Sequence, residues 1–384
     1  MVVAGEPSGD LQAGLLLEQL RLRRPSWSFF GVGGPRMATQ GFEQLVGIDE
    51  MAVIGFADVL RKVPFFRRVF ARLNRAIKQQ RPDAVILVDY PGFNLRLASS
   101  ASVTGLHVIY YIAPQIWAWG EGRITKMRRC VGLLIPIFPF EQEYFQSRGI
   151  NTQRVGHPLL DVVKPAMGGK VFRESVGLSG DARLITLLPG SRPAEVKRHL
   201  PVMLAAVRRL TDENQSLAPV VACAPGIDQA LIFAAAGKSN CRDLSVSGDT
   251  YSAIAAAELA FVKSGTATIE CAMLGVPFVA MYKTGMLNYQ IARRLIKTKH
   301  IAMVNLVAGE TVVPEFIQHE ATPENIVHAA RKLFLDDDYR RKMILDLQNV
   351  RDKLGPPGGA GQAAEIIIAW LEGTTGAAEQ KQHV

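Results

Sequence analysis

Short apolar segments alternate with helical segments along this chain, and the alternation starts twice. In the first half, Val85–Val88 and Val108–Ile112 have the length and composition of buried strands. The pattern begins again with Leu184–Leu188, a helix expected at about 195–212, and Leu259–Val262. Strands that alternate with helices form parallel sheets covered on both faces. The sequence therefore predicts an α/β protein with two Rossmann-like domains.

The length of 384 residues agrees with two domains, because it exceeds what one hydrophobic core usually organises. Pro and Gly interrupt the pattern at Gly156–Pro158, so we place the boundary near residue 160. We expect domains at residues 1–160 and 161–345. Residues 346–384 should form a last helix, at 363–372, and a disordered tail, with the option of packing back on the N-terminal domain.

Four cysteines are scattered along the chain without a Cys-x-x-Cys pair or a histidine at metal-ligand spacing. This pattern argues against a disulfide framework and a zinc site, and it fits a reducing cytoplasm. The segment Met1–Gly5 reaches a glycine too early for a signal peptide, and no apolar run is long enough to cross a bilayer. We expect a cytoplasmic protein whose membrane contacts are peripheral.

The formal charge of +9 is concentrated in one short stretch. Between residues 61 and 81 there is no acidic residue, and there are eight basic ones: Arg61, Lys62, Arg67, Arg68, Arg72, Arg75, Lys78 and Arg81. Aromatic and aliphatic residues alternate with them. Such a basic, aromatic amphipathic helix is typical of a membrane interface, which makes Phe65, Phe66, Arg67 and Arg68 the predicted membrane contacts.

Two other interpretations of this basic stretch stay open. A nucleic-acid surface ranks lower, because no recognition fold accompanies the charge and phosphate binding needs no aromatic excess. We therefore expect no nucleic-acid partner. The other interpretation is a core helix whose basic side faces solvent.

The segment Ala4–Asp10 has the order strand end, glycine turn, helix start, in which backbone N–H groups and the helix dipole attract an anion. Its glycines lack the spacing of the dinucleotide-binding fingerprint. Glu6 and Ser8 would lie at the ligand-binding edge of the sheet. The alternative is a simple turn in which Ser8 or Asp10 caps the helix.

Two turns of the same kind occur in the second half. Ser191 and Arg192 follow a predicted strand and could bind a phosphate. A second turn could bind a diphosphate through backbone N–H and hydroxyl groups, and Glu270 one helical turn later could accept hydrogen bonds from ribose. The residues of that turn are Ser264, Gly265 and Thr266. Two such turns in one half predict a nucleoside diphosphate site.

Asp89 follows a predicted strand, where open α/β sheets bind ligands and where a general base would lie. An Asp that caps the next turn is an equally common alternative. The loop after the next strand contains Gln115, Trp117 and Trp119, which could face a sugar or a lipid. Buried packing of the two indoles is the simpler explanation.

One Asp-x-Asp sequence, at Asp336–Asp338, resembles the magnesium-binding pattern of some sugar transferases. It lies far from any predicted strand end, so a solvated turn is the better interpretation. The seven histidines form no set of ligands, and His157 beside a proline is expected to be structural. We expect neither a metal ion nor a cofactor.

Taken in order, nine segments resemble the lipid-A-disaccharide synthase family, and the resemblance covers about residues 4 to 320. The segments are Ala4–Asp10, Gly31–Met37, Val88–Asn94, Pro114–Trp119, Phe138–Glu141, Gly156–Pro158, Pro189–Arg192, Ser264–Thr268 and Asn305–Gly309. The start Gly-Glu-Pro-Ser-Gly-Asp, together with the loop Pro-Gln-Ile-Trp-Ala-Trp, is specific to that family.

The resemblance implies a GT-B fold, with two Rossmann-like domains facing a central cleft, and metal-independent transfer with inversion. It implies that UDP-2,3-diacylglucosamine reacts with 2,3-diacylglucosamine 1-phosphate (lipid X). The products would be UDP and the β-1,6-linked lipid A disaccharide 1-phosphate. These partners place the enzyme on the anionic cytoplasmic face of the inner membrane of a Gram-negative bacterium. The oligomeric state stays open, with a homodimer as one option.

The resemblance also implies roles for the residues found above. Asp89 would deprotonate the acceptor 6-hydroxyl. The two anion-binding turns would stabilise the leaving UDP, and Glu270 would bind its ribose. Asn305 and Gln318 would contact the donor sugar. The competing hypotheses are a soluble GT-B enzyme such as a UDP-sugar epimerase and a membrane-binding protein without catalysis.

Overall fold

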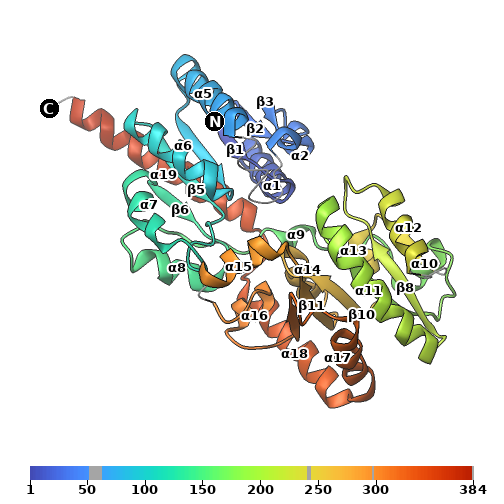
Figure 1. Ribbon diagram of the computed structural model, residues 1–384. Helices are drawn as coiled ribbons and strands as arrows, with labels where there is room; N and C mark the ends of the chain where they lie inside the picture. Colours follow the sequence, from blue (N-terminus) through green and yellow to red (C-terminus); the bar gives the residue numbers. More distant parts are fainter. Residues whose placement is uncertain (52–62, 240–243, 296–297, 383–384) are drawn as a thin grey trace. The chain divides into compact units, whose positions relative to one another are not determined.

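The computed structural model describes residues 1–51, 63–239, 244–295 and 298–382. It divides into two compact units (Figure 1). Unit 1 contains Met1–Asp161, Leu295 at the end of helix α15 (Met286–Leu295), and the C-terminal segment from Leu354. Unit 2 contains Val162–Arg294 and Thr298–Lys353. The chain therefore passes from unit 1 to unit 2 and returns to unit 1.

Unit 1 is built on a parallel sheet of six strands in the order β3-β2-β1-β4-β5-β6. Its strands are β1 (Val2–Ala4), β2 (Phe30–Gly33), β3 (Glu43–Gly47), β4 (Ala84–Val88), β5 (His107–Tyr111) and β6 (Leu133–Ile135). Its helices are α1 (Pro7–Arg23), α2 (Pro35–Ala38), α3 (Ile48–Met51), α5 (Val63–Gln80), α6 (Pro91–Val103), η1 (Glu121–Arg123), α7 (Ile124–Cys130), α8 (Pro139–Gln146), α9 (Leu159–Val162) and α19 (Gly359–Gln382).

Unit 2 repeats this architecture with the strand order β12-β11-β10-β7-β8-β9, again all parallel. Its strands are β7 (Arg183–Leu188), β8 (Leu217–Ala222), β9 (Ser245–Ser247), β10 (Ala257–Lys263), β11 (Phe278–Tyr282) and β12 (Glu315–Ile317). Its helices are α10 (Gly169–Ser175), α11 (Pro193–Glu213), α12 (Gln229–Lys238), α13 (Thr250–Ala255), α14 (Thr266–Met273), α15 (Met286–Leu295), α16 (Met303–Ala308), α17 (Pro323–Leu335) and α18 (Asp337–Lys353).

Both sheets have the doubly wound order 3-2-1-4-5-6 when each is counted from its own first strand. The central strands are buried on both faces, which explains why Val85–Val88 is continuously apolar. Several helices that follow these strands begin with proline, which suits the first helical turn because that turn needs no N–H partner. The predicted α/β architecture with two Rossmann-like halves is thus confirmed.

The C-terminal helix α19 packs against α1 in unit 1, and Figure 1 draws it in red among the blue and teal elements of that unit. It runs from Gly359 to Gln382, so it is longer at both ends than the predicted helix at 363–372, and the tail predicted to be disordered is helical as far as Gln382. Residues 346–353, which the sequence analysis grouped with it, belong to α18 and unit 2.

Candidate functional site

In each sheet, the strand order reverses between the first and fourth strands, and open α/β sheets bind ligands at that point. In unit 1, Ala4 of β1 lies beside Val88 of β4, so the next residues, Gly5 and Asp89, leave the sheet side by side. In unit 2, Leu188 of β7 lies beside Val262 of β10. The predicted Asp89 and both predicted anion-binding turns therefore follow the strands at these two reversal points.

Asp89 has an unusual backbone conformation. Its φ is +44° and that of Tyr90 is +48°, both in the left-handed region that non-glycine residues rarely occupy. The Asp89 carbonyl oxygen accepts hydrogen bonds from the Tyr110 hydroxyl (2.5 Å) and the Asn94 side-chain amide (2.8 Å). Strained backbone held by surrounding hydrogen bonds is concentrated at functional sites.

Gly5 is the residue that leaves room for this turn. A Cβ atom at Gly5 would lie 2.6 Å from the ring of Tyr90. The Tyr90 hydroxyl in turn donates to the carbonyl oxygen of Met51 (3.1 Å). The glycine therefore reflects a close approach of the two strand ends.

Asp10 has a structural role, but it does not cap its own helix α1, as the alternative given above had it. It is buried, and its carboxylate accepts hydrogen bonds from the backbone N–H groups of Gly34 (2.8 Å), Arg36 (3.0 Å) and Met37 (3.1 Å). It caps α2 and ties α1 to the Gly31–Met37 segment. At the N-terminus of α1, Glu6 is partly buried and Ser8 is exposed, so both are accessible.

Trp117 is held by a carboxyl group to which the sequence analysis gave no role. The Trp117 indole N–H donates to Glu141 (3.0 Å), and the backbone N–H of Phe138 donates to the other oxygen of that carboxyl (3.2 Å). Glu141 is 1% exposed, and this burial raises its pKa to about 8. Gln115 and Trp119, in the same loop, are exposed.

In unit 2, the turn between β7 and α11 contains Ser191, which is exposed, and Arg192, which is partly buried. The carboxylate of Glu195, in the first turn of α11, lies against this turn. It accepts from the Ser191 backbone N–H (3.1 Å) and lies 3.4 Å from the Arg192 guanidinium. The predicted anion-binding turn thus already binds a carboxylate of its own chain.

The second turn lies between β10 and α14. Lys263 forms an ion pair with Glu195 (3.0 Å), which connects the two turns. Ser264 is 6% exposed, and its hydroxyl has no hydrogen-bond partner in the described part of the chain. Gly265 has a φ of +156° and Thr266 is exposed. An unpartnered buried hydroxyl is costly and suggests a group that a ligand would complete.

Glu270 lies one turn into α14 and is partly buried. Removal of water by the surrounding protein raises its pKa to about 7. Gln318 follows β12 with a φ of +55°, and its amide exchanges two hydrogen bonds with the backbone of Thr284 (both 3.0 Å). These contacts fix Gln318 at the edge of the sheet.

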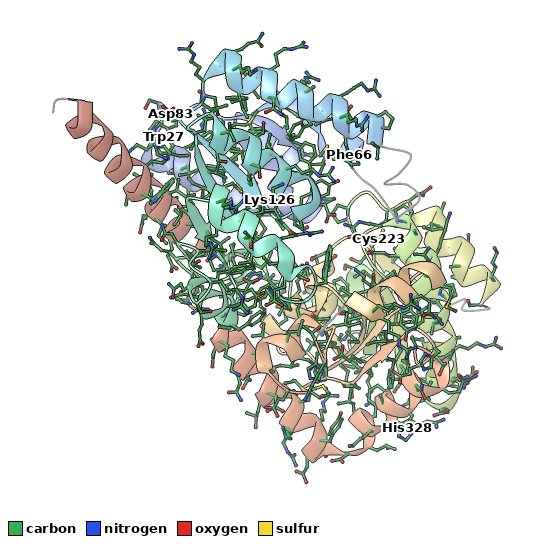
Figure 2. The ribbon with its side chains drawn as sticks, turned by 60° about the vertical axis from the view of Figure 1, so that its left-hand side comes forward. Trp27, Phe66, Asp83, Lys126, Cys223 and His328 are labelled. Atoms are coloured by element: carbon green, nitrogen blue, oxygen red, sulfur yellow. The ribbon has the colours of Figure 1, made fainter. Side chains whose placement is uncertain are left out.

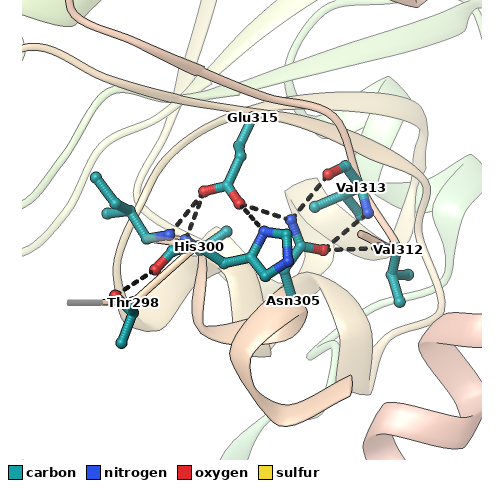
Figure 3. Close-up of polar contacts among 8 residues, drawn as sticks. Thr298, His300, Asn305, Val312, Val313 and Glu315 are labelled. Atoms are coloured by element: carbon teal, nitrogen blue, oxygen red, sulfur yellow. Dashed lines mark hydrogen bonds and ion pairs between the residues drawn. The ribbon is translucent and has the colours of Figure 1, made fainter. Parts of the chain in front are cut away.

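Asn305 is fully buried in a network of polar contacts, shown in Figure 3. Its side-chain oxygen accepts from the N–H groups of Val312 (2.8 Å) and Val313 (3.0 Å), and its amide donates to Val313 (2.9 Å) and Glu315 (3.0 Å). Glu315 also contacts His300 (2.7 Å). A donor-sugar contact from Asn305 does not fit this geometry, because the amide is enclosed and its hydrogen-bonding capacity is used.

The predicted membrane residues lie on α5. Phe65 and Phe66, of which Figure 2 labels the second, are partly buried and pack against the core of unit 1. The centroid of the Phe66 ring lies 6.2 Å from that of Phe93. Arg67 and Arg68 are exposed. The other basic residues of α5, Arg72, Arg75 and Lys78, are exposed too, and so is Arg81, which follows the helix. Arg61 and Lys62 lie outside the described residues. The exposed part of α5 is therefore cationic, and its rings face partly inward.

The described residues contain neither a membrane-spanning helix nor a cluster of metal ligands. No helix among them has both the length and the apolar character needed to cross a bilayer. The described part of the chain also contains no group of three His, Cys, Asp or Glu side chains that could hold a metal ion. At the Asp-x-Asp sequence, Asp336 accepts from the Tyr339 N–H (2.9 Å) and Asp338 pairs with Arg341 (2.7 Å).

Sequence reasoning gave no role to Glu141, Glu195 and Lys263, although each lies in or next to a segment that it selected. Lys263 and Glu195 could have been found from the sequence, because each is a charged residue next to a predicted anion-binding turn. Glu141 gave no such signal, because a carboxyl group in a helix start normally faces solvent.

A model of the family described as "Lipid-A-disaccharide synthetase" matches residues 1–359. The lipid-A-disaccharide synthase of Myxococcus xanthus (strain DK1622) is 39% identical over 371 residues, which cover 97% of this chain and 97% of that protein. The lipid-A-disaccharide synthase of Geobacter sulfurreducens is 40% identical over 376 residues, again with 97% of both chains covered.

Solved structures with a similar fold are far more distant in sequence. The S. aureus MnaA–UDP structure has a TM-score of 0.66 at 13% identity, covering 97% of this chain and 96% of that one. The calicheamicin glycosyltransferase CalG4 has a TM-score of 0.58 at 15% identity and covers 97% of both chains. These similarities establish the fold, which is of the GT-B type.

Proposed function

The chain belongs to the lipid-A-disaccharide synthetase family, and from that premise we propose that it is the glycosyltransferase that forms the lipid A disaccharide. It would transfer 2,3-diacylglucosamine from UDP to the 6-hydroxyl of 2,3-diacylglucosamine 1-phosphate. The acceptor oxygen attacks the anomeric carbon, the bond from that carbon to the UDP oxygen breaks, and the configuration inverts. UDP and the β-1,6-linked disaccharide 1-phosphate are the products.

The observation that carries this proposal is the position of Asp89 at the end of β4, in a left-handed conformation fixed by Tyr110 and Asn94. These contacts hold the backbone of Asp89, and its carboxylate would accept the proton of the attacking hydroxyl as the new bond forms. Glu6 and Ser8 on the neighbouring helix start, together with Gln115 and Trp117, are the proposed acceptor contacts.

The donor nucleotide is proposed to bind unit 2. Ser191 and Arg192 of the first turn and three residues of the second would bind the diphosphate and stabilise the charge that grows on it as the bond breaks. Those three residues are Ser264, Gly265 and Thr266. Glu270 would accept from the ribose hydroxyls, and Gln318 would lie nearest the sugar. We leave Asn305 out of this site because its amide is enclosed and already hydrogen-bonded.

Both substrates carry acyl chains, so we propose that the enzyme works as a peripheral protein on the anionic cytoplasmic face of the inner membrane. The exposed cations of α5, among them Arg67 and Arg68, support this proposal, because each cation near an anionic leaflet contributes about 1 kcal/mol. Phe65 and Phe66 would contribute less than free aromatic side chains, since both already pack partly against the core.

The test is an assay with UDP-2,3-diacylglucosamine and lipid X, following both UDP release and the lipid product. We expect Asp89→Asn to reduce turnover by about 10²–10⁴-fold, the usual contribution of a general base. UDP affinity should stay near the wild-type value, because the amide keeps the shape of the side chain. The control is Asp83→Asn, which removes a carboxylate just before the start of the same strand (Figure 2) and should leave turnover unchanged.

Three outcomes would contradict the proposal. Near-normal turnover of Asp89→Asn would assign the base to another residue. Interconversion of UDP-sugars without lipid X would favour a soluble epimerase. Vesicle binding with no reaction of either substrate would favour a membrane-binding protein without catalysis.

A further inference from the structure

Glu195 occupies the centre of the two anion-binding turns of unit 2. Its carboxylate contacts the Ser191 backbone N–H (3.1 Å), the Arg192 guanidinium (3.4 Å) and the Lys263 ammonium (3.0 Å). Backbone N–H groups, a guanidinium and an ammonium are the groups that proteins use to bind phosphate. One internal carboxylate is therefore bound by a set of donors suited to a phosphate.

The glycines of the two turns make room for these charged groups. A Cβ atom at Gly190, whose φ is +125°, would lie 2.6 Å from the Cβ atom and a carboxylate oxygen of Glu195. A Cβ atom at Gly265 would lie 3.2 Å from the Lys263 Nζ. An independent observation comes from Ser264, next to Lys263. This residue is 6% exposed, and its hydroxyl has no hydrogen-bond partner among the described residues. The turns are thus shaped around the ion pairs but keep one polar group unused.

The balance of charge favours an added anion. Burial alone would raise the pKa of Glu195, but Lys263 and Arg192 hold it below its ordinary value, so the carboxylate is ionised at neutral pH. Lys263 and Arg192 are two cations, and Glu195 is the one anion between them, so the net charge of this group is +1. The positive end of the α11 helix dipole adds to it. A diphosphate carries more negative charge than a carboxylate and would be preferred by the same donors.

We propose that Lys263 is a diphosphate-binding residue and that the Glu195 carboxylate competes internally for its ammonium group. Before the nucleotide binds, Glu195 holds Lys263 and Arg192 at the turns. When a nucleoside diphosphate binds, its phosphate oxygens take over these cations, and Glu195 either shares them or moves away. This inference rests on the proposed function and adds a residue and a means of regulation to the same site.

The competition has a functional consequence. A carboxylate near the diphosphate opposes its binding, so it lowers the affinity for UDP and favours release of this product. Lys263 acts in the opposite direction. The two residues should therefore change UDP affinity with opposite signs, which a purely structural ion pair would not do.

The experiment measures UDP and uridine binding to the full chain by isothermal titration calorimetry. We expect Lys263→Met to weaken UDP binding about 10-fold or more, the size expected for one charge-assisted hydrogen bond. We expect Glu195→Gln to tighten it about 3-fold to 10-fold, because the amide keeps an acceptor for Ser191 but carries no charge. Uridine, which has no phosphate, should bind all variants alike.

Matched controls are available in the same unit. Glu213→Gln removes a carboxylate that pairs with Arg331 at the other end of α11, and Lys342→Met removes a lysine that pairs with Asp346. Neither substitution should change UDP affinity. In the wild-type protein, saturating UDP should protect Lys263, and not Lys342, from acetylation by an amine-reactive ester. That measurement needs no variant to fold.

The outcomes separate the two proposals. Weaker UDP binding by a folded Glu195→Gln variant would make Glu195 a positioning residue and overturn the competition. Wild-type affinity in Lys263→Met, or equal acetylation of Lys263 with and without UDP, would overturn its role in binding. If the wild-type chain binds UDP, these failures leave the proposed transferase intact, whereas a wild-type chain that binds no UDP overturns both.

Discussion

Asp89 and Tyr90 have successive left-handed backbone angles, and their conformation depends on a neighbour with no side chain. Gly5→Ala would place a Cβ atom 2.6 Å from the Tyr90 ring, a distance at which one of the two must move. We expect this variant to lose about 1–3 kcal/mol of stability, as for other overpacked sites, and most of its activity. Unfolding in urea and the disaccharide assay measure the two effects.

Gly9→Ala is the control for that substitution. The nearest atom to its Cβ would be the Ala4 Cβ at 3.4 Å, an ordinary contact, and Gly9 lies in the first turn of α1, shortly after Gly5. If Gly5→Ala and Gly9→Ala have equal activity, the close approach to Tyr90 does not matter for Asp89.

Titration of Glu141 makes the stability of the folded protein depend on pH, and the direction of this dependence follows from its raised pKa. Burial raises its pKa to about 8 in the folded protein, whereas an unfolded glutamate has a pKa of about 4.3. Between these two values the unfolded chain releases a proton that the folded chain keeps. Stability from this group is therefore fully present below the lower pKa and is lost as pH rises toward 8, by at most about 1.4 kcal/mol per pH unit.

Glu141→Gln should remove that dependence, because the amide does not titrate. We expect the stability difference between variant and wild type to shift in favour of the variant from pH 5 to pH 8, measured by urea unfolding. Trp117 fluorescence should change little, since the amide oxygen can still accept from the indole. A constant difference across this range would show that the Glu141 carboxyl titrates normally.

For single residues, the sequence predicted a position correctly where both the residue type and its place directly after a strand pointed to a ligand-binding edge. Asp89 and the turn at Ser264 lie at the strand ends where they were expected. Asn305 could not be judged in this way, because its use depends on Val312, Val313 and Glu315, which come together only in the folded chain. The partners of Glu141 and Lys263 were hidden for the same reason.

Helix α5 combines an apolar side that packs partly against the core of unit 1 and a cationic side that is exposed. Arg67→Glu with Arg68→Glu should weaken sedimentation with anionic vesicles, mainly at low salt, because exposed charges are screened as ionic strength rises. The control is Arg128→Glu with Arg129→Glu on α7, two exposed arginines of the same unit. If both double variants lose vesicle binding to the same extent, the effect comes from net charge and not from the position of the arginines on α5.

The aromatic part of α5 calls for a different expectation. Phe65→Ser with Phe66→Ser should reduce vesicle binding at every salt concentration, but it should also lower the melting temperature, since the Phe66 ring contacts Phe93. The amphipathic pattern predicted the helix correctly. It could not tell whether the apolar side faces lipid or the protein core, because both remove the same side chains from water.

Considered as a whole, the chain forms two parallel sheets covered by helices, and the apolar pattern predicted these two Rossmann-like halves but not their strand order. The return of α19 to unit 1 depends on contacts across more than 200 residues, such as that between the Gly156 N–H and Gln362 (3.1 Å). Trp370 anchors the same helix beside Gly132 and His107. No local pattern reports contacts of that range.

Trp370 and Gly132 allow the docking of α19 to be measured. A Cβ atom at Gly132 would lie 2.8 Å from the Trp370 ring, so Gly132→Ala should cost about 1–3 kcal/mol of stability through overpacking. Trp370→Ala should cost about 2–4 kcal/mol, because the lost ring is only partly buried. In the double variant the added methyl group meets no ring, so the two costs should not add.

Urea unfolding of the four proteins gives the coupling between the two sites. Gly92→Ala is the control, since no atom of another described residue outside its own turn would lie within 4 Å of its Cβ atom. Strict additivity of the Gly132 and Trp370 effects would mean that α19 is not held against this part of unit 1.

The double passage of the chain between its units also governs how the protein is made. A ribosome delivers residues 1–161 first, yet the surface of α1 that α19 covers stays bare while all of unit 2 is being translated. Three apolar residues of α19, Ala363, Ala364 and Ile367, are fully buried in the finished protein and emerge more than 190 residues later. Unit 1 is therefore begun first and completed last, and nascent chains should depend on chaperones for that interval.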